Sequence, residues 1–330
     1  MSKLLYLICS HNNPDQVKRL VYCLKNGDPD SLIFIHHDSS SSLLDKAYFS
    51  SLKDIYFIDD YVRVEWGDFS MVGMMLHCLK KIHSLTMKFD WLFLLSGQDY
   101  PVKPLREIKE FYEVSTYDAY LLYDKVLTSK YWHKYEGFNR YYFNYFKIPK
   151  FKYWHKIPET LRLKGRKLRN IFNEIQPFLR IKPLPRKLNT RVGIRKQYNI
   201  FNNDFECYGG AQWFTINKNA YDYIISYVDS NPSYVDYFRF TLIPDEAFFH
   251  TILLNNNKLN ICNDYKRFIS WSRSDAAHPD TLTSTDFSSI ILSDRHFARK
   301  FDVNVDTKVL DMLDEHIGNN NVSTGNNGTC

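Results

Sequence analysis

The sequence WLFLLSGQDYP occupies residues 91–101 and joins a short apolar run to a polar turn. Its first five residues are apolar, and a run of this length that ends at Ser96 and Gly97 is typical of a buried strand. Similar runs occur at residues 4–9, 32–35 and 55–58, with helical patterns at 14–25 and 69–85. Strands that alternate with helices predict an α/β fold with a mostly parallel sheet flanked by helices.

Polar or aromatic residues follow each of these predicted strands, namely His11, Asp38, Trp66 and the segment from Ser96 to Asp99. In open α/β sheets, ligands bind beyond the carboxyl ends of the strands. We therefore expect a ligand site at this edge. The chain contains neither G-x-G-x-x-G nor G-x-x-x-x-G-K-[ST], which excludes the usual dinucleotide fingerprint and the P-loop.

The composition is that of a globular protein, with 44% hydrophobic and 24% charged residues among 330. We predict one domain over residues 1–317 and a disordered tail over 318–330, which is rich in Asn and Gly. Six cysteines form no Cys-x-x-Cys pair, so reduced thiols are expected. The sequence shows no signal-peptide core and no run near the roughly 18 apolar residues of a membrane span. We expect a cytoplasmic protein, or one that is peripheral at the inner membrane.

The middle of the chain is strongly basic. Residues 125–196 contain 20 Lys and Arg against 3 acidic residues, whereas the whole chain has a net charge of +6. Tyr, Trp and Phe recur through the same segment. We interpret it as a basic, aromatic helical insertion, either a solvated surface or a contact for an anionic membrane, a lipid diphosphate or an acidic polymer. Nucleic acid is not expected as a partner, because no recognised nucleic-acid-binding motif occurs.

The regular pattern returns in the C-terminal part. Gly209 and Gly210 are expected to turn into a strand that continues to Phe214, and helices are expected at 219–228 and 287–292. A strand is predicted at 268–271. Pro244 is expected to open another helix, with Asp245 and Glu246 at its positively polarised end.

These segments together resemble glycosyltransferase family 14, the core-2/I-branching β-1,6-N-acetylglucosaminyltransferases, peptide O-xylosyltransferases and short bacterial relatives. The resemblance spans about residues 3–305, outside the basic segment, and six motifs occur in the family's order. They are His36-His37-Asp38, Trp66-Gly67-x-x-Ser70, Leu95-Ser96-Gly97-Gln98-Asp99-Tyr100-Pro101, Gly209-Gly210-x-x-Trp213-Phe214, Pro244-x-Glu246-x-Phe248-Phe249-His250-Thr251 and Phe297-Ala298-Arg299-Lys300-Phe301.

The resemblance implies a GT-A-like fold and an inverting reaction without a divalent metal or other cofactor. Glu246 matches the family's catalytic glutamate, although a helix-capping acid is the alternative. Arg299 and Lys300 match the family's diphosphate-binding residues, although a surface pair is the alternative. The flanking Phe297 and Phe301 favour a segment that is anchored in the core. Arg273 or Arg267 is expected to add a third positive charge. Asp28-Pro29-Asp30 could mimic a metal-binding D-x-D motif, but its proline favours a turn.

The remaining candidate residues divide between donor and acceptor. We assign the donor nucleoside and sugar to His11, Asp38, Trp66 and Ser96, and the acceptor to Asp99, Gln212, Trp213 and Trp271. For Asp99, orientation of the donor is the alternative. No metal ligands are expected, since His11, His36, His37 and His250 lack a zinc-binding spacing and are interpreted as structural.

The predicted function is transfer of N-acetylglucosamine or xylose from a UDP-sugar to a hydroxyl of a glycan, lipid-linked or peptide acceptor. A bacterial surface polysaccharide is the expected product. A peptide O-xylosyltransferase is the alternative enzyme, against which stands Gln212 where those enzymes carry an acid. A catalytically inactive protein that binds a glycan or a membrane is the alternative outside enzymes.

Overall fold

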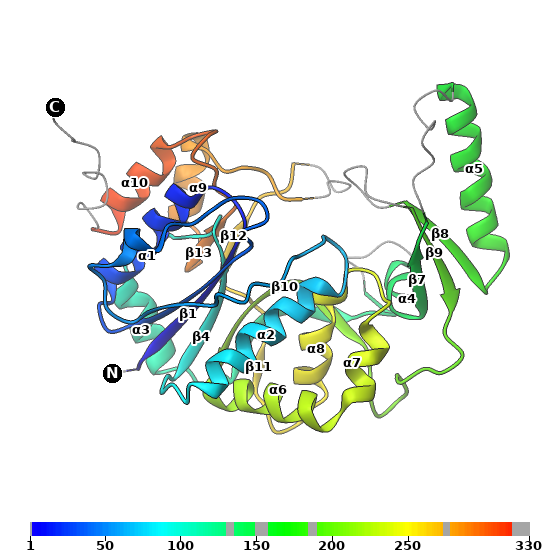
Figure 1. Cartoon of the computed structure of the whole chain (residues 1–330), viewed down its shortest axis with the longest axis horizontal. Coiled ribbons are helices and arrows are strands. Elements are labelled where there is room, and N and C mark those ends of the chain that lie inside the picture. Colours follow the sequence, from blue (N-terminus) through cyan, green and yellow to red (C-terminus); the bar gives the residue numbers. More distant parts are fainter. Residues whose placement is uncertain (1, 130–134, 149–157, 184–189, 273–277, 319–330) are drawn as a thin grey trace.

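The computed structural model describes residues 2–129, 135–148, 158–183, 190–272 and 278–318. A seven-stranded sheet forms its centre, in the order β11-β6-β10-β4-β1-β2-β3 (Figure 1). Its strands are β1 (Leu4–Ser10), β2 (Leu32–His37), β3 (Ile55–Phe57), β4 (Trp91–Ser96), β6 (Ala119–Lys125), β10 (Tyr208–Asn217) and β11 (Ile261–Cys262). Every pairing is parallel except those of β10, which runs antiparallel to β4 and β6. The predicted, mostly parallel sheet is confirmed.

Helices cover both faces of this sheet (Figure 1). One face packs against α1 (Pro14–Gly27), α3 (Leu105–Glu113), α9 (Phe287–Ile291) and α10 (Lys308–His316). The other packs against α2 (Ser70–Ser84), α6 (Lys218–Ser230), α7 (Pro232–Phe238) and α8 (Phe248–Leu254). In β1, Leu5 and Leu7 enter one core while Tyr6 and Ile8 enter the other, as the alternation of side chains along a strand requires. Burial on both faces explains why these strands read as continuous apolar runs.

Two smaller sheets complete the described part of the chain. The first has the order β12-β13-β5 and consists of β5 (Tyr100–Pro101), β12 (Arg267–Ile269) and β13 (Phe297–Arg299). It therefore joins the segment after β4 to the C-terminal Arg299-Lys300 motif. Phe297 and Phe301 are buried, as the sequence predicts.

The second small sheet lies in the basic segment and has the order β7-β9-β8. The segment holds α4 (Glu136–Tyr141), β7 (Phe143–Lys147), α5 (Glu159–Ile175), β8 (Leu179–Pro183) and β9 (Thr190–Arg195). The prediction of a helical insertion is therefore incomplete. Phe143 and Tyr145 alternate with Asn144 in a buried and half-buried pattern, a period of two that favours a strand over a helix.

Several predicted boundaries change. The expected strand at 268–271 is β12 and ends before Trp271. The glycines expected to form a turn before β10 lie inside it, and the register shifts between Gly210 and Phe214. A Cβ on Gly210 would lie 1.8 Å from the carbonyl oxygen of Leu122, so only glycine fits there. Asp28-Pro29-Asp30 forms the predicted turn. The predicted tail lies outside the described residues from 319 onward.

Candidate active site

A cavity of about 700 Å³ opens at the carboxyl ends of β1, β2 and β4, where the sequence predicts a ligand site. This volume lies within the usual range of small-molecule sites, roughly 300–1,000 Å³. Most of the predicted site residues line it: His11, Asp38, Trp66, Ser96, Gln212, Trp213, Glu246, Trp271, Arg299 and Lys300. They come from segments up to 289 residues apart, between His11 and Lys300. Arg273 lies outside the described residues.

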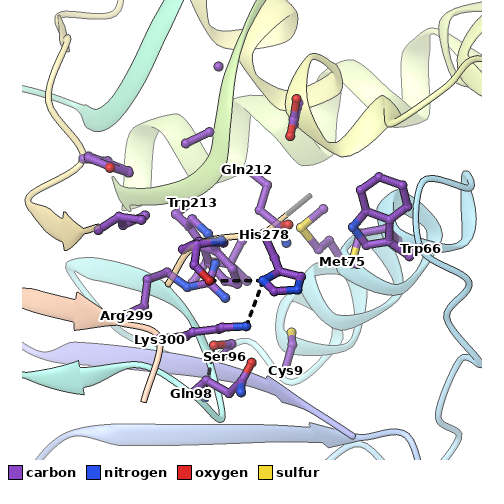
Figure 2. A pocket seen from close by; sticks show the side chains of 18 of the residues that line it. Cys9, Trp66, Met75, Ser96, Gln98, Gln212, Trp213, His278, Arg299 and Lys300 are labelled. Carbon is purple, nitrogen blue, oxygen red and sulfur yellow. Dashed lines mark hydrogen bonds between the residues drawn. The ribbon is translucent and has the colours of Figure 1, made fainter. Parts of the chain in front are cut away.

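Arg299 is held rigidly on one wall of the cavity (Figure 2). Its guanidinium carbon lies 4.0 Å from the ring centroid of Trp213, a cation–π contact. Its Nε lies 3.1 Å from Oδ1 of Asp99, whose side chain is fully buried. The structure thus corrects the expected place of Asp99: it lies beneath Arg299 and is not among the residues that line the cavity. Its carboxylate orients the arginine.

A second arginine shares the same carboxylate. Nε of Arg267 lies 3.8 Å from Oδ2 of Asp99, and its Nη2 donates to the carbonyl oxygen of Leu94. Arg267 is 2% exposed, so it supports this wall from behind and does not face the cavity. Two guanidiniums around one carboxylate leave an excess positive charge beside the cavity.

Lys300 adds a further cation to the same wall. Its Nζ lies 3.2 Å from Nδ1 of His278, and Figure 2 shows the two side chains pointing toward each other. Arg299 and Lys300 thus place two positively charged side chains along the cavity. This arrangement is typical of sites for phosphate groups.

Asp38 and the two histidines before it connect the ends of neighbouring strands. Oδ1 of Asp38 accepts from Ser40, and its Oδ2 accepts from the amide of Val64 at 3.2 Å. Burial alone would raise the pKa of Asp38, but these hydrogen bonds outweigh it and hold the pKa below its ordinary value. Asp38 therefore stays ionised at the cavity.

His36 accepts a hydrogen bond from the amide of Val62, and His37 bonds to Ser10 and Ser42. Burial lowers the pKa of His36 to about 4, so it is neutral at physiological pH. The interpretation of His36 and His37 as structural residues agrees with these contacts. His11, in contrast, is exposed at the cavity.

Glu246 faces the cavity from a turn and not from an α-helix. Residues Pro244–Glu246 form a single 3-10 turn, and α8 begins only at Phe248, which corrects the predicted helix start. The preceding Ile243 has φ 49° and donates its N–H to the carbonyl of Gly67 at 3.1 Å. This contact with the neighbouring loop, together with the left-handed residue, fixes the turn.

The positive charge beside Glu246 comes from Arg140 in α4. One Nη of Arg140 donates to Oε2 of Glu246, and the other donates to Oε1 of Glu136. The side chain of Arg140 is only 15% exposed, against 32% for Glu246. A guanidinium of the basic insertion, rather than a helix N-terminus, therefore accompanies the candidate catalytic carboxylate.

Asp245, the neighbour of Glu246, is buried and behaves differently. Burial, and then the negative charge of Glu246, raise the pKa of Asp245 to about 7. Asp245 does not line the cavity. The two adjacent acids are therefore distinguished by their surroundings, and only Glu246 can reach a ligand.

The basic insertion also holds the loop that carries Trp66. Lys147 in β7 pairs with Glu65 at 2.5 Å, and Arg191 in β9 pairs with Asp68 at 3.0 Å. Trp66 lies between these two acids in the sequence and lines the cavity on the side opposite Arg299 (Figure 2). Two basic residues of the insertion, Lys147 and Arg191, therefore pair with the loop at the rim of the cavity.

Two observations concern a metal and a membrane. Within the described ranges, no group of three or more His, Cys, Asp or Glu side chains is placed to hold a metal ion. Of the helices that the structure describes, none combines the length and the apolar character needed to cross a membrane.

Comparison with protein families identifies the family to which this chain belongs. The model of the Core-2/I-branching enzyme family matches residues 6–293. The chain belongs to the Core-2/I-branching enzyme family. The resemblance drawn from the sequence motifs is confirmed, and the match extends across the basic segment.

Individual relatives align with parts of the chain. Beta-glucuronosyltransferase GlcAT14A of Arabidopsis thaliana is 33% identical over 118 residues, which cover 35% of this chain and 26% of that protein. Xylosyltransferase 2 of Rattus norvegicus is 29% identical over 129 residues, 33% of this chain and 15% of that protein. These matches therefore span about a quarter or less of the relatives' length. Among solved structures, apo mouse xyloside xylosyltransferase 1 aligns over 90% of this chain and 97% of that chain, with 12% identity and a TM-score of 0.37.

The six motifs that carry the resemblance in the sequence meet in the cavity, and five of them lie within the residues that the family model matches. Each contributes at least one lining residue: His36 and Asp38, Trp66, Ser96 and Gln98, Gly209 to Trp213, Glu246, and Arg299 with Lys300. Because the register shift in β10 follows Gly210, Ala211 to Trp213 leave the ladder and contribute to the cavity wall. Trp271 stands at the rim and is 52% exposed.

Sequence reasoning missed two partners of the site residues. Arg140 is one of many basic residues in its segment, and no spacing singles it out. His278 follows residues outside the described ranges and belongs to no motif, yet it contacts Lys300. Both contacts join residues that are distant in the sequence, so a local pattern could not reveal them.

Proposed function

We propose that this chain transfers a sugar from a UDP-sugar to a hydroxyl group with inversion at the anomeric carbon, with Glu246 as the general base. The observation that carries the proposal is the charge distribution of one cavity. A carboxylate, Glu246, and two cations, Arg299 and Lys300, line it from different segments. Such a pair of opposite charges suits a reaction that removes a proton at one place and releases an anion at another.

In this reaction the acceptor oxygen attacks the anomeric carbon as the bond to the UDP oxygen breaks. Glu246 takes the hydroxyl proton, and the bonding electrons leave with UDP. Arg299 and Lys300 offset the charge that develops on the diphosphate, the task that a metal ion performs in other transferases. Asp99 and Trp213 keep the Arg299 guanidinium in place, so little reorganisation is needed during the reaction.

We further propose that His11, Asp38, Trp66 and Ser96 contact the donor, whereas Gln212, Trp213 and Trp271 face the acceptor. The proposed sugar is N-acetylglucosamine or xylose, and the acceptor a glycan or glycoconjugate, as in the synthesis of a bacterial surface polysaccharide. Membership of a glycosyltransferase family and the position of these residues around one cavity support this assignment. The names of the relatives make UDP-glucuronic acid a donor to compare.

The test is UDP release from a panel of UDP-N-acetylglucosamine, UDP-xylose and UDP-glucuronic acid, with and without EDTA. We expect turnover of one donor that EDTA does not abolish. Glu246→Gln should lower kcat at least 100-fold, by loss of the general base, while UDP affinity is kept. Glu107→Gln, at an exposed acid of α3, is the matched control. Turnover that requires Mn²⁺, or an active Glu246→Gln variant, would overturn the mechanism. UDP binding without turnover of any donor would indicate a binding protein.

A further inference from the structure

The outer helix of the basic insertion, α5, carries an apolar stripe that the chain leaves exposed. Leu161, Leu168, Ile171, Phe172 and Ile175 recur at intervals of three, four and seven residues, the spacing of one helix face. All five are exposed, with Leu168 at 67% and Ile175 at 78%. Figure 1 shows α5 at the edge of the molecule, away from α1 and α10.

The contact between α5 and the body of the protein uses a different side of the helix. The side chain of Asn173 donates to the carbonyl of Ile181 at 3.0 Å and accepts from its amide at 2.8 Å, which ties α5 to β8. At 3.6 residues per turn, Asn173 lies about 140° around the helix from Leu168. The stripe is therefore turned away from the sheet on which α5 rests.

Two more exposed apolar residues follow the helix. After Gln176 and Pro177, Phe178 is 66% exposed and Leu179 is 38% exposed. Since exposed large apolar patches mark interaction sites, the stripe indicates a binding partner.

The charges of α5 identify the kind of partner. The helix carries five basic residues, Arg162, Lys164, Arg166, Lys167 and Arg169, against Glu159 and Glu174. The mutual repulsion of neighbouring cations, after burial, is one reason why the pKa of Arg169 lies below its ordinary value. A second copy of this chain would bring the same cations together across the stripe. A partner with an anionic surface and an apolar interior complements both the basic charge of α5 and its apolar stripe.

We propose that α5 is a membrane-docking helix that lies in the headgroup region of an anionic bilayer, with the stripe toward the acyl chains. A surface position suits an amphipathic helix of this kind, in which Lys and Arg reach back to the phosphates. The proposal is independent of the sugar-transfer chemistry, because none of the described residues of α5 lines the cavity. Docking would hold the chain at the surface where a lipid-linked acceptor resides.

The experiment is sedimentation of the full chain with phosphatidylcholine vesicles, with and without phosphatidylglycerol. We expect binding to the mixed vesicles that weakens with salt, and little binding to phosphatidylcholine alone. Leu168→Asp and Ile175→Asp should each weaken binding about tenfold or more, since each removes one inserted apolar side chain. Leu292→Asp, at a leucine beyond α9 that is 85% exposed, should leave binding unchanged. Lys164→Glu, at a position about 40° around the helix from Leu168, should weaken binding only to the anionic vesicles.

All variants should keep the wild-type circular dichroism spectrum and UDP affinity, so that a loss of binding reports on the surface alone. Vesicle binding that Leu168→Asp and Ile175→Asp leave intact would overturn the proposal. A dimer in sedimentation velocity that Leu168→Asp dissociates would also overturn it, because the stripe would then belong to a second copy.

Discussion

Replacement of Arg140 by glutamine tests whether the basic insertion takes part in catalysis. Arg140 donates to Glu246 and to Glu136, and its side chain is 15% exposed. Glutamine keeps most of the length of the side chain but removes the charge and the two-pronged geometry. The variant leaves two carboxylates facing each other with no guanidinium between them.

The expected loss of stability follows from burial. Removal of one partner of a buried ion pair costs roughly 3–5 kcal/mol, because a charge is left uncompensated. The two carboxylates are 27% and 32% exposed and can regain water, so we expect a value near the lower end, about 3 kcal/mol. For catalysis, a displacement of the base by about 1 Å is enough to reduce kcat about 100-fold.

The assay is a double-mutant cycle on kcat and on urea unfolding, with Arg140→Gln, Glu246→Gln and the double variant. If Arg140 acts through Glu246, Arg140→Gln should cost little further activity once Glu246 is replaced. Binding of UDP should not change, since Arg140 does not line the cavity. Arg106→Gln, at an exposed ion pair with Glu110, is the matched control.

Two results would contradict this reasoning. The first is a wild-type kcat and unfolding midpoint for Arg140→Gln. The second is a fall in activity of equal size in the presence and absence of Glu246, which would mean that Arg140 acts elsewhere.

Three further predictions concern the cavity wall that carries Arg299 and Lys300 and the pH dependence of stability. Asp99→Asn leaves two buried guanidiniums without their shared carboxylate and should lower the free energy of unfolding by roughly 3–5 kcal/mol in urea titrations. An unchanged midpoint of urea unfolding would show that Asp99 does not support this wall. Lys300→Ala removes a cation from the cavity and should weaken UDP binding about tenfold to 100-fold by calorimetry. Lys80→Ala, at an exposed ion pair, is the control and should not weaken it. Equal UDP affinities of Lys300→Ala and the wild type would disprove the role of Lys300. Burial lowers the pKa of His36 and His250 to about 4 and that of His296 to about 3. As the pH falls, these histidines therefore take up protons in the unfolded chain before they do so in the folded one. The free energy of unfolding should thus fall as the pH decreases from about 6.5 toward 4. Asp245 opposes this trend, because its pKa of about 7 in the folded chain lies above its value in the unfolded chain. Its contribution to stability is present at low pH and is lost as the pH rises, so Asp245→Asn should make the acid-induced loss of stability steeper. Parallel curves of unfolding free energy against pH for the variant and the wild type would argue against a buried neutral Asp245.

The sequence predicted the helices and strands that depend on local patterns. Residues 4–9, 32–35 and 91–95 are apolar because both faces of their strands are buried, and that requirement is visible in any short window. The turn at Asp28-Pro29-Asp30 and the buried Phe297 and Phe301 follow from local chemistry in the same way.

The prediction failed where a neighbour from another part of the chain decided the conformation. The helix expected at Pro244 is interrupted because Ile243 bonds to Gly67 and Glu246 reaches Arg140. The basic segment was expected to be helical, but the alternating aromatics of β7 pair with β9 in a sheet. Neither outcome is encoded within a few residues of the segment itself.

The sequence alone determined which residue types are available at the site and in what order, because strand periodicity and the family motifs are local properties of the chain. Only the tertiary structure decided their partners: Asp99 became a buried support for two arginines, and Arg140 came to lie against Glu246, 106 residues away. The physical reason is that an ion pair depends on distance in space and on burial. Both are set only when the sheet, the insertion and the loops pack together.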